Sequence, residues 1–349
     1  MSVFEHNEYD HHKNVVFCHD TKSGLKAIIA VHNTNLGQSL GGCRMFPYAD
    51  SAEALTDVLR LSKGMTYKAA MANLPQGGGK AVIIGNPRND KNHDMFLAFG
   101  DFINKLEGDY ITAEDSGISV ADLTISAQRT QYVSGIQAKF RYDGRPSDGN
   151  PASGTAYGVF VGLQASVKYR LNCGLQGIKV AIQGLGHVGY RLAEMLHEAG
   201  SQLFVTDIYP EQLERARTEL GATVVSPDKI FGLDMDVFAP CAMGAIINEH
   251  SIPQLKVKVI AGAANNQLDH EELGLVLRHK EILYAPDYVI NAGGIIDIYH
   301  QTQNGSPSDL KEHLEAIGTT LHEIYTRTDG TNESTNVISN KIAEERFNK

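Results

Sequence analysis

The chain has 349 residues, 42% of them hydrophobic and 21% charged, which is longer than a single hydrophobic core supports and predicts two domains with a cleft between them. Its formal net charge of −10 argues against a nucleic-acid partner, and no apolar run reaches the roughly 18 residues of a membrane span. The N-terminus lacks a secretory signal pattern and the four cysteines are isolated, so we expect a cytoplasmic protein with no metal site and no membrane partner.

Two apolar runs near the N-terminus predict the first strands. Residues 15–18 and 25–32 flank a polar segment that contains glycine, which is typical of an antiparallel pair joined by a hairpin turn. A helix is then predicted from Ser51, with Asp50 as its cap, and its apolar spacing places Lys68 at or just past the helix end. We therefore expect an α/β domain with a mixed sheet.

Two charged residues follow at the ends of short predicted strands. Residues 81–84 predict a buried strand that emerges from a glycine turn at residues 77–79, and Lys80 belongs to that turn. The apolar run 110–113 predicts the next strand, and Asp115 comes just after it. Asp115 is thus expected at a strand end, where catalytic groups are often mounted.

A segment rich in Gly, Pro, Asp and Asn, residues 142–151, predicts the boundary between two domains, which we place at residues 1–140 and 141–325. Beyond the boundary, strands alternate with helices, and this alternation predicts a parallel, doubly wound sheet. The predicted strands are residues 178–183, 203–206, 237–239, 259–261 and 282–284, with helices over 187–199 and after Pro210.

The C-terminal part predicts helices. Apolar residues recur at helical spacing after Ser306 and Pro307, which are typical of a helix cap and first turn: Leu310, Leu314, Ile317, Leu321 and Ile324. This amphipathic helix is expected to pack in the core, with part of its stripe available for a subunit contact. A last helix over about 326–349 is expected to return to the first domain.

A glycine fingerprint in the second domain predicts a dinucleotide site of the Rossmann type. It consists of Gly184, Leu185, Gly186, His187, Val188 and Gly189, and it lies between a predicted strand and a predicted helix. Asp207 follows Gly189 by 18 residues (207 − 189), near the spacing at which a carboxylate accepts from the adenosine ribose. Because no arginine stands at residues 208–210, we expect NAD rather than NADP as the cofactor.

Two lysines and one aspartate predict the reacting centre. Lys80 follows Lys68 by twelve residues (80 − 68), and Asp115 comes 35 residues after Lys80 (115 − 80). One lysine can hold a carboxylate as a point charge, and a second, close to the first, can lose its proton near neutral pH and act as a base. With the glycine fingerprint, this combination indicates hydride chemistry on an anionic substrate.

Several longer blocks resemble those of the glutamate, leucine, phenylalanine and valine dehydrogenase family, in the same order and over nearly the whole chain. They are residues 41–44, 64–68, 74–87, 262–266 and 284–294. The resemblance implies oxidative deamination of an L-amino acid to a 2-oxo acid and ammonia. It also implies a substrate-binding, catalytic and oligomerisation domain at the N-terminus and an assembly of identical subunits, a dimer or an octamer.

The resemblance also implies residue roles. Lys68 would hold the substrate α-carboxylate, Lys80 would hydrogen-bond the reacting centre and activate water, and Asp115 would carry protons to and from the amine. On the cofactor side it places Cys241, Ala242, Asn265 and Asn291 in loops that follow strands, although either asparagine could instead cap its own loop.

The side-chain pocket that the resemblance implies is apolar. It consists of Leu40, Met65, Ala113, Ile295 and Ile298. Family members that bind glutamate have a lysine and a serine at the positions of Leu40 and Ile298, so glutamate is disfavoured. We expect leucine or another branched-chain amino acid, with phenylalanine or tryptophan as the alternative. A catalytically inactive sensor of NAD or an amino acid is a more remote alternative.

Overall fold

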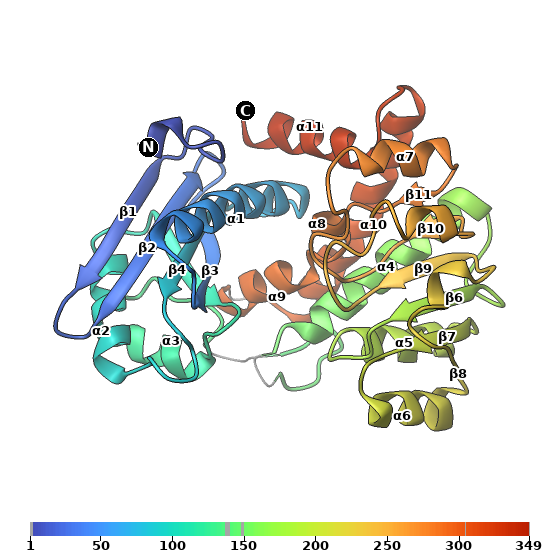
Figure 1. The fold of residues 1–349 in the computed structure, drawn as a ribbon, viewed down its shortest axis with the longest axis horizontal. Coiled ribbons are helices and arrows are strands. Elements are labelled where there is room, and N and C mark those ends of the chain that lie inside the picture. Colours follow the sequence, from blue (N-terminus) through green and yellow to red (C-terminus); the bar gives the residue numbers. More distant parts are fainter. Residues whose placement is uncertain (1–2, 137–139, 148–149, 304, 349) are drawn as a thin grey trace.

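The computed structural model describes residues 3–136, 140–147, 150–303 and 305–348. It has two α/β domains, each built around one sheet, with the first on the left of Figure 1 and the second on the right. Residues 148 and 149 of the predicted linker lie outside the described residues. The exact domain boundaries therefore stay a prediction.

The first domain contains the expected mixed sheet, with strand order β1-β2-β4-β3-β5. Neighbours β1 and β2, and β2 and β4, are antiparallel, whereas β3 runs parallel to both β4 and β5. The strands are β1 Asn14–Asp20, β2 Leu25–Asn33, β3 Ser39–Phe46, β4 Gly77–Ile84 and β5 Tyr110–Glu114.

Helices cover both faces of this sheet. The long helix α1, Ser51–Met71, packs on one face, and Asp50 caps it as expected by accepting from the backbone N–H groups of Ala52 and Glu53. Helices α2, His93–Asn104, and α3, Val120–Ser126, lie on the other face (Figure 1). Lys68 lies in the last turn of α1, where the helix dipole favours a cation.

The prediction of a glycine turn before Lys80 is wrong. Gly77, Gly78 and Gly79 are the first residues of strand β4, and Lys80 lies within that strand. Their role is close approach: a Cβ on Gly77 would lie 1.9 Å from the carbonyl oxygen of Asn33, and one on Gly78 only 2.0 Å from the backbone nitrogen of Thr66. The glycines therefore allow β4 to fit tightly against β2 and α1.

The second domain has the expected parallel sheet, in the order β11-β10-β9-β6-β7-β8. Read from the other edge, this is the dinucleotide-binding order 3-2-1-4-5-6, in which successive strands are added towards one edge from the first strand and towards the other edge from the fourth, so that the strand order reverses between β6 and β9. The strands are β6 Lys179–Gln183, β7 Gln202–Thr206, β8 Thr223–Val224, β9 Val237–Pro240, β10 Val259–Ile260 and β11 Leu283–Tyr284.

The helices of the second domain lie on both sides of its sheet (Figure 1). They are α4 Ala152–Leu171, α5 Gly189–Glu198, α6 Pro210–Leu220, α7 Leu273–His279, α8 Asp287–Ile290, α9 Gly293–Thr302 and α10 Pro307–Asp329. Short 3-10 helices occur in this domain at Ile230–Gly232 and Ile252–Gln254, and before the first domain's sheet at Val3–Glu5. In the part of the chain that the structure describes, no helix combines the length and the apolar character needed to cross a bilayer.

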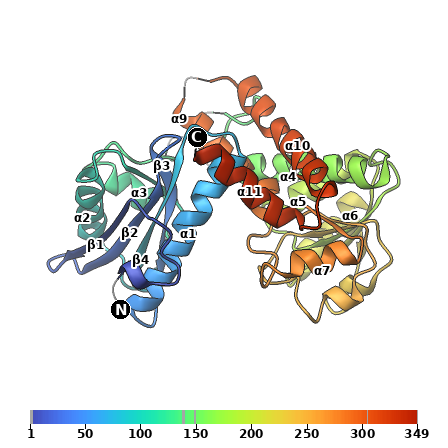
Figure 2. The ribbon, with the colours of Figure 1, turned by 90° about the horizontal axis from the view of Figure 1, so that it is seen from above.

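The C-terminal segment does not form one helix over about 326–349. Helix α10 continues to Asp329, and α11, Thr335–Phe347, begins after a short connection. Helix α10 has the expected Ser306 cap, and all five residues of its predicted apolar stripe are buried. Figure 2 shows α11 between α1 and the second domain.

Helix α11 is attached to α1 by specific contacts. The ring of Phe347 lies 5.3 Å from that of Tyr67, and the Tyr67 hydroxyl donates to Glu344 at 2.7 Å. Arg346 donates to the carbonyl oxygen of Ala70 at 3.1 Å. The C-terminus thus supports the helix that carries Lys68.

Candidate active site

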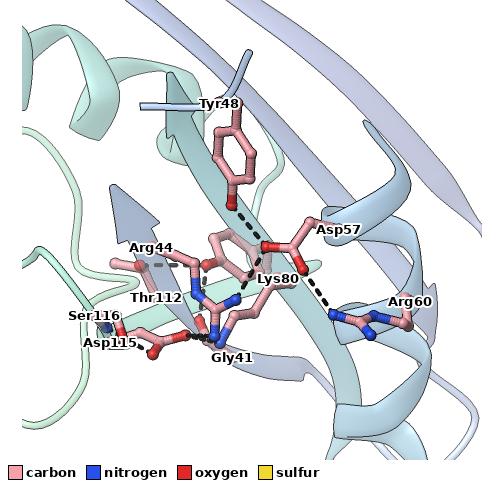
Figure 3. A network of polar contacts seen from close by, with 10 residues as sticks. Gly41, Arg44, Tyr48, Asp57, Arg60, Lys80, Thr112, Asp115 and Ser116 are labelled. Carbon is pink, nitrogen blue, oxygen red and sulfur yellow. Dashed lines mark hydrogen bonds and ion pairs between the residues drawn. The ribbon is translucent and has the colours of Figure 1, made fainter. Parts of the chain in front are cut away.

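Lys80 and Asp115 meet in the structure (Figure 3). Lys80 comes from β4 and is only 6% exposed, and Asp115 directly follows β5. The Lys80 ammonium donates a hydrogen bond to the Asp115 carboxylate. The two residues are therefore paired in a largely buried place, where charge interactions are stronger than in water.

Strand β3 lies between the strands that present these two residues, and its glycines make room for them. A Cβ on Gly42 would lie 2.6 Å from the carbonyl oxygen of Glu114 and 2.8 Å from the Cβ of Asp115. A Cβ on Gly41 would lie 1.7 Å from the carbonyl oxygen of Gly79. Any larger residue at either position would push β4 and the Asp115 segment apart.

A second cation, Arg44, approaches the same carboxylate. Its Nη2 lies 3.6 Å from Oδ2 of Asp115, and the backbone N–H of Ser116 donates to Oδ1 at 2.6 Å. Burial favours the neutral form of Asp115, but the charges of Lys80 and Arg44 outweigh it and hold the pKa of Asp115 below its usual value. Sequence reasoning missed Arg44, although it ends the Gly41 to Arg44 block.

Lys68 lies apart from this pair and reaches towards the second domain. Its ammonium donates to Oδ1 of Asn291 at 2.6 Å, and the Asn291 amide donates to Oδ1 of Asn265 at 2.8 Å. Burial is the main cause that lowers the pKa of Lys68 to about 8, Lys80 adds to it, and the negative charge of Asp287 opposes it. Asn291 is a neutral partner, so the charge of Lys68 remains available to an anion.

The residues of the expected substrate pocket belong to, or pack against, one large apolar cluster that extends over both domains. Leu40, Ala113 and Ile295 are buried in one continuous apolar cluster, and Met65 and Ile298 pack against it. They belong to β3, β5, α9 and α1, so the pocket that the resemblance implies would draw on both domains. Ile295 and Ile298, three residues apart on α9, share one helix face.

An open cavity of about 840 Å³ lies at the carboxyl ends of β6, β7 and β9. Most of the predicted cofactor residues line it: Gly184, Leu185, Gly186, His187, Asp207, Cys241 and Ala242. The remaining four do not. Val188 precedes α5 as its cap residue and Gly189, the first residue of α5, is buried, while Asn265 and Asn291 belong to the chain of contacts with Lys68.

The glycines of this cavity match the needs of a bound dinucleotide. Gly184 has φ +98°, and a Cβ on it would lie 2.7 Å from that of Ala242. A Cβ on Gly189 would lie 2.0 Å from the carbonyl oxygen of Gly184, so this glycine lets α5 pack closely on the turn. A Cβ on Gly186 would meet nothing within 4 Å, which leaves open space for a phosphate beside the N-terminus of α5.

Sequence reasoning missed two arginines of the cavity, Arg191 and Arg215. Arg215 is paired with Glu219 at 3.1 Å and lies over the ring of Tyr190 at 3.8 Å, and Glu194 is 3.9 Å away. Arg191 lies on α5 and Arg215 on α6, after the glycine fingerprint in the chain. The sequence alone did not show that these arginines lie on the helix faces that line the cavity. Among the described residues, no group of three His, Cys, Asp or Glu side chains could hold a metal ion.

Comparison with known proteins gives matches over both domains. Residues 12–134 match the family model "Glu/Leu/Phe/Val dehydrogenase, dimerisation domain", and residues 210–346 match the model "Glutamate/Leucine/Phenylalanine/Valine dehydrogenase". The first match contains Lys68, Lys80 and Asp115, and the second contains Asn265 and Asn291.

Full-length relatives are named for different amino acids. Leucine dehydrogenase of Geobacillus stearothermophilus is 48% identical over 99% of this chain and 94% of its own length. L-tryptophan dehydrogenase of Nostoc punctiforme is 45% identical over 100% of this chain and 97% of its own. Phenylalanine dehydrogenase of Caldalkalibacillus thermarum is 43% identical, with coverages of 100% and 95%. The crystal structure of the Nostoc enzyme superposes with a TM-score of 0.87, covering 97% of this chain and 96% of that one.

Proposed function

This chain belongs to the glutamate, leucine, phenylalanine and valine dehydrogenase family, and from that membership we propose that it deaminates an apolar L-amino acid with NAD. The activity class, amino acid dehydrogenase, follows from the family and from full-length relatives. The substrate, the choice of NAD and the residue roles are the proposal. Leucine and the other branched-chain amino acids are its first choice.

The observation that carries the proposal is the division of charge around the apolar pocket. Lys68, with its neutral partner Asn291, is free to bind the α-carboxylate that every amino acid has. Lys80 and Asp115 form a separate buried pair. One cation therefore holds the substrate, and the other pair handles protons at the reacting carbon.

The proton steps follow from this arrangement. The bound nicotinamide supplies the acceptor for the hydride of the α-carbon. Asp115, which is held ionised, accepts a proton from the substrate ammonium before that step. Lys80 then takes a proton from water as the water oxygen attacks the imine carbon. Asp115 returns its proton to the nitrogen, and once ionised again it takes the proton of the newly added hydroxyl as the carbon–nitrogen bond breaks, so that ammonia leaves and the carbonyl of the 2-oxo acid forms.

The pocket supports an aliphatic side chain. A second carboxylate, as in glutamate, would be buried against Leu40 and Ile298 without a partner, at a cost of several kcal/mol. The branched side chains of Ile295 and Ile298 narrow the pocket and favour leucine over a flat ring. One methylene changes binding by only about 1 to 3 kcal/mol, so phenylalanine and tryptophan are the alternative substrates.

Asp207 supports NAD over NADP. Its carboxylate accepts from the backbone N–H groups of Leu185, at 2.5 Å, and Tyr209, at 2.9 Å, so it is held at the mouth of the glycine turn. A carboxylate at this place can accept a hydrogen bond from the 2′-hydroxyl of the adenosine ribose, and its negative charge repels the 2′-phosphate of NADP. Arg215 lies in the same cavity, but its charge is offset by Glu219.

A cytoplasmic homo-oligomer, dimer or octamer, completes the proposal. It rests on the family and on the dimerisation domain that the matching model describes for residues 12–134. Measurement of molar mass in solution by light scattering tests the subunit number. A monomer at working concentration would contradict it.

A substrate panel tests the proposed function. The purified chain should form NADH with L-leucine, L-isoleucine and L-valine at alkaline pH, more slowly with the aromatic amino acids, and not with glutamate. Lys80→Ala should abolish turnover and leave NADH binding intact, because Lys80 is not among the residues that line the cofactor cavity. The absence of turnover with every apolar amino acid would refute the proposal.

A further inference from the structure

A network of side chains adjoins Asp115 at Oδ2, the same carboxylate oxygen that Lys80 contacts (Figure 3). Arg44, from β3, donates to Oδ2 of Asp57 at 3.0 Å through Nη1, and its Nη2 faces Asp115 at 3.6 Å. Asp57, from α1, is further held by the Tyr48 hydroxyl at 2.7 Å and by Arg60 at 3.2 Å. The guanidinium of Arg44 therefore bridges two carboxylates and is fixed by one of them.

The proposed reaction makes this bridge important. Lys80 must be neutral when it takes a proton from water, and in that state it no longer supplies a positive charge to Asp115. Arg44 cannot lose its proton in the working pH range, so its charge is permanent. A partly buried carboxylate without any cation nearby would take up a proton and could not accept another from the substrate.

We propose that Arg44, itself held by Asp57, is a positioning residue for the deamination reaction: it holds Asp115 beside Lys80 and keeps it ionised until it accepts the proton of the substrate ammonium. This inference rests on the function proposed above. It adds a role for Arg44, which takes no direct part in the proposed proton steps and acts through Asp115.

Several other titratable groups face Asp115 and are common to every variant compared below. They come from β4, α1, β3, β5 and the connection after β3: Lys80, Lys68, Cys43, Glu114, Tyr110 and Tyr48. Loss of the Arg44 charge removes a positive charge from this coupled group. The pKa of whichever member limits the reaction then rises, because the positive charge favoured its deprotonated form.

Arg44→Gln tests the inference, with Arg60→Gln as the matched control. Both substitutions remove one positive charge that contacts Asp57, but Arg60 lies on the exposed face of α1, with its side chain 57% exposed, and contacts the other oxygen of Asp57. We expect the acid limb of kcat/KM for the amino acid to move up by about 1 pH unit in Arg44→Gln. At pH values below this limb, kcat/KM should be about tenfold lower than in the wild type. In Arg60→Gln the limb should stay at its wild-type position.

The outcomes separate the inference from the proposed function. The substrate's own amino group titrates in the same way for each enzyme, so only the enzyme limb differs between them. If Arg44→Gln loses activity equally at all pH values, Arg44 is merely structural and the inference is wrong. If the wild-type chain turns over no apolar amino acid, the proposed function itself has failed.

A second variant keeps the test decisive if Arg44→Gln does not fold. Lysine at position 44 keeps a positive charge, but a single ammonium cannot bridge Asp57 and Asp115 as the guanidinium does. The acid limb of Arg44→Lys should lie between those of the wild type and the neutral variant, above the wild-type value. A limb at the wild-type pH in a folded Arg44→Lys that binds NADH normally would overturn the inference. The chain has no tryptophan, so NADH fluorescence reports binding without a tryptophan background.

Discussion

At the scale of single residues, Lys68 and Lys80 show how surroundings divide the work between two identical side chains. Lys80 is paired with a carboxylate, Asp115, whereas Lys68 has a neutral amide, Asn291, as its partner. A buried ammonium next to a neutral group loses hydration without gaining a charge, and this lowers the pKa of Lys68 to about 8. In the proposed role of Lys68, the substrate carboxylate would supply the missing charge.

This leads to a pH prediction for substrate binding. Lys68 must be protonated to hold a carboxylate, and with a pKa of about 8 its protonated fraction falls as the pH rises through that value. The inhibition constant of 4-methylpentanoate, a carboxylate that lacks the amino group of leucine, should be constant below pH 7 and rise above pH 8, by about tenfold per pH unit.

Lys68→Met supplies the control for that measurement. Its inhibition constant should be high and should not vary over the same pH range, because no charge is left to titrate. A wild-type inhibition constant that stays constant from pH 7 to 9.5 would show that Lys68 does not bind the carboxylate.

At the scale of secondary-structure elements, the glycines of β3 and β4 decide how closely the first sheet packs. They lie inside strands, where glycine is unfavourable, because the neighbouring backbones leave no space for a side chain. Gly78 faces the backbone of Thr66 on α1, the helix that carries Met65 and Lys68. The distance between β4 and α1 therefore sets the position of Lys68 relative to Lys80.

Two glycine substitutions should have opposite effects. Gly78→Ala puts a Cβ 2.0 Å from the Thr66 backbone, so we expect it to lower the free energy of unfolding by at least about 2 kcal/mol and to reduce turnover. Gly64 lies in the middle of α1, and a Cβ added there would have nothing within 4 Å. Gly64→Ala should therefore raise the free energy of unfolding by about 0.5 to 1 kcal/mol. Urea denaturation measures both changes, and a Gly78→Ala protein as stable as the wild type would contradict the close approach.

At the scale of the whole molecule, the two domains share the site. Lys80 lies in the first sheet and Asp115 directly follows it, the cofactor cavity belongs to the second sheet, and Ile295 and Ile298 of α9 belong to or pack against the apolar cluster that extends over both domains. Helix α11 connects the end of the chain to α1, through Phe347, which is 5% exposed and packs on Tyr67 and His32. The C-terminal helix thus holds α1 against the rest of the structure.

Removal of the Phe347 ring should test this connection. Phe347→Ala should lower the free energy of unfolding by about 3 kcal/mol and raise the KM for the amino acid, because α1 carries Lys68. The Kd for NADH should not change, since the cofactor cavity contains no residue of α11. Phe4→Ala, at a side chain that is 78% exposed, is the control and should change stability by less than about 1 kcal/mol. If Phe347→Ala left the KM for the amino acid unchanged, the prediction that α11 influences substrate binding through α1 would be wrong.

Much of this protein could be predicted from local sequence patterns. The α/β fold, the parallel second sheet, the cap at Asp50 and the stripe of α10 are confirmed, because each depends on residues close together in the chain. Strand β3, with its unusual pair of glycines, and the long helix α4 were missed. Strand β3 contains two adjacent glycines, which are unfavourable in a strand. Their reason is the close approach of β4 and of the segment that ends β5, which the sequence does not show.

The sequence by itself determined the family, and with it the activity class, and it predicted two lysines and an aspartate as the reacting centre and a glycine turn with Asp207 as the dinucleotide site. These choices could be read because each functional group is a property of its own residue. Only the tertiary structure decided the pairings, with Lys80 on Asp115, Lys68 on Asn291 and Arg44 between two carboxylates. Pairing depends on distances between segments far apart in the chain, and those distances are set by how strands and helices pack.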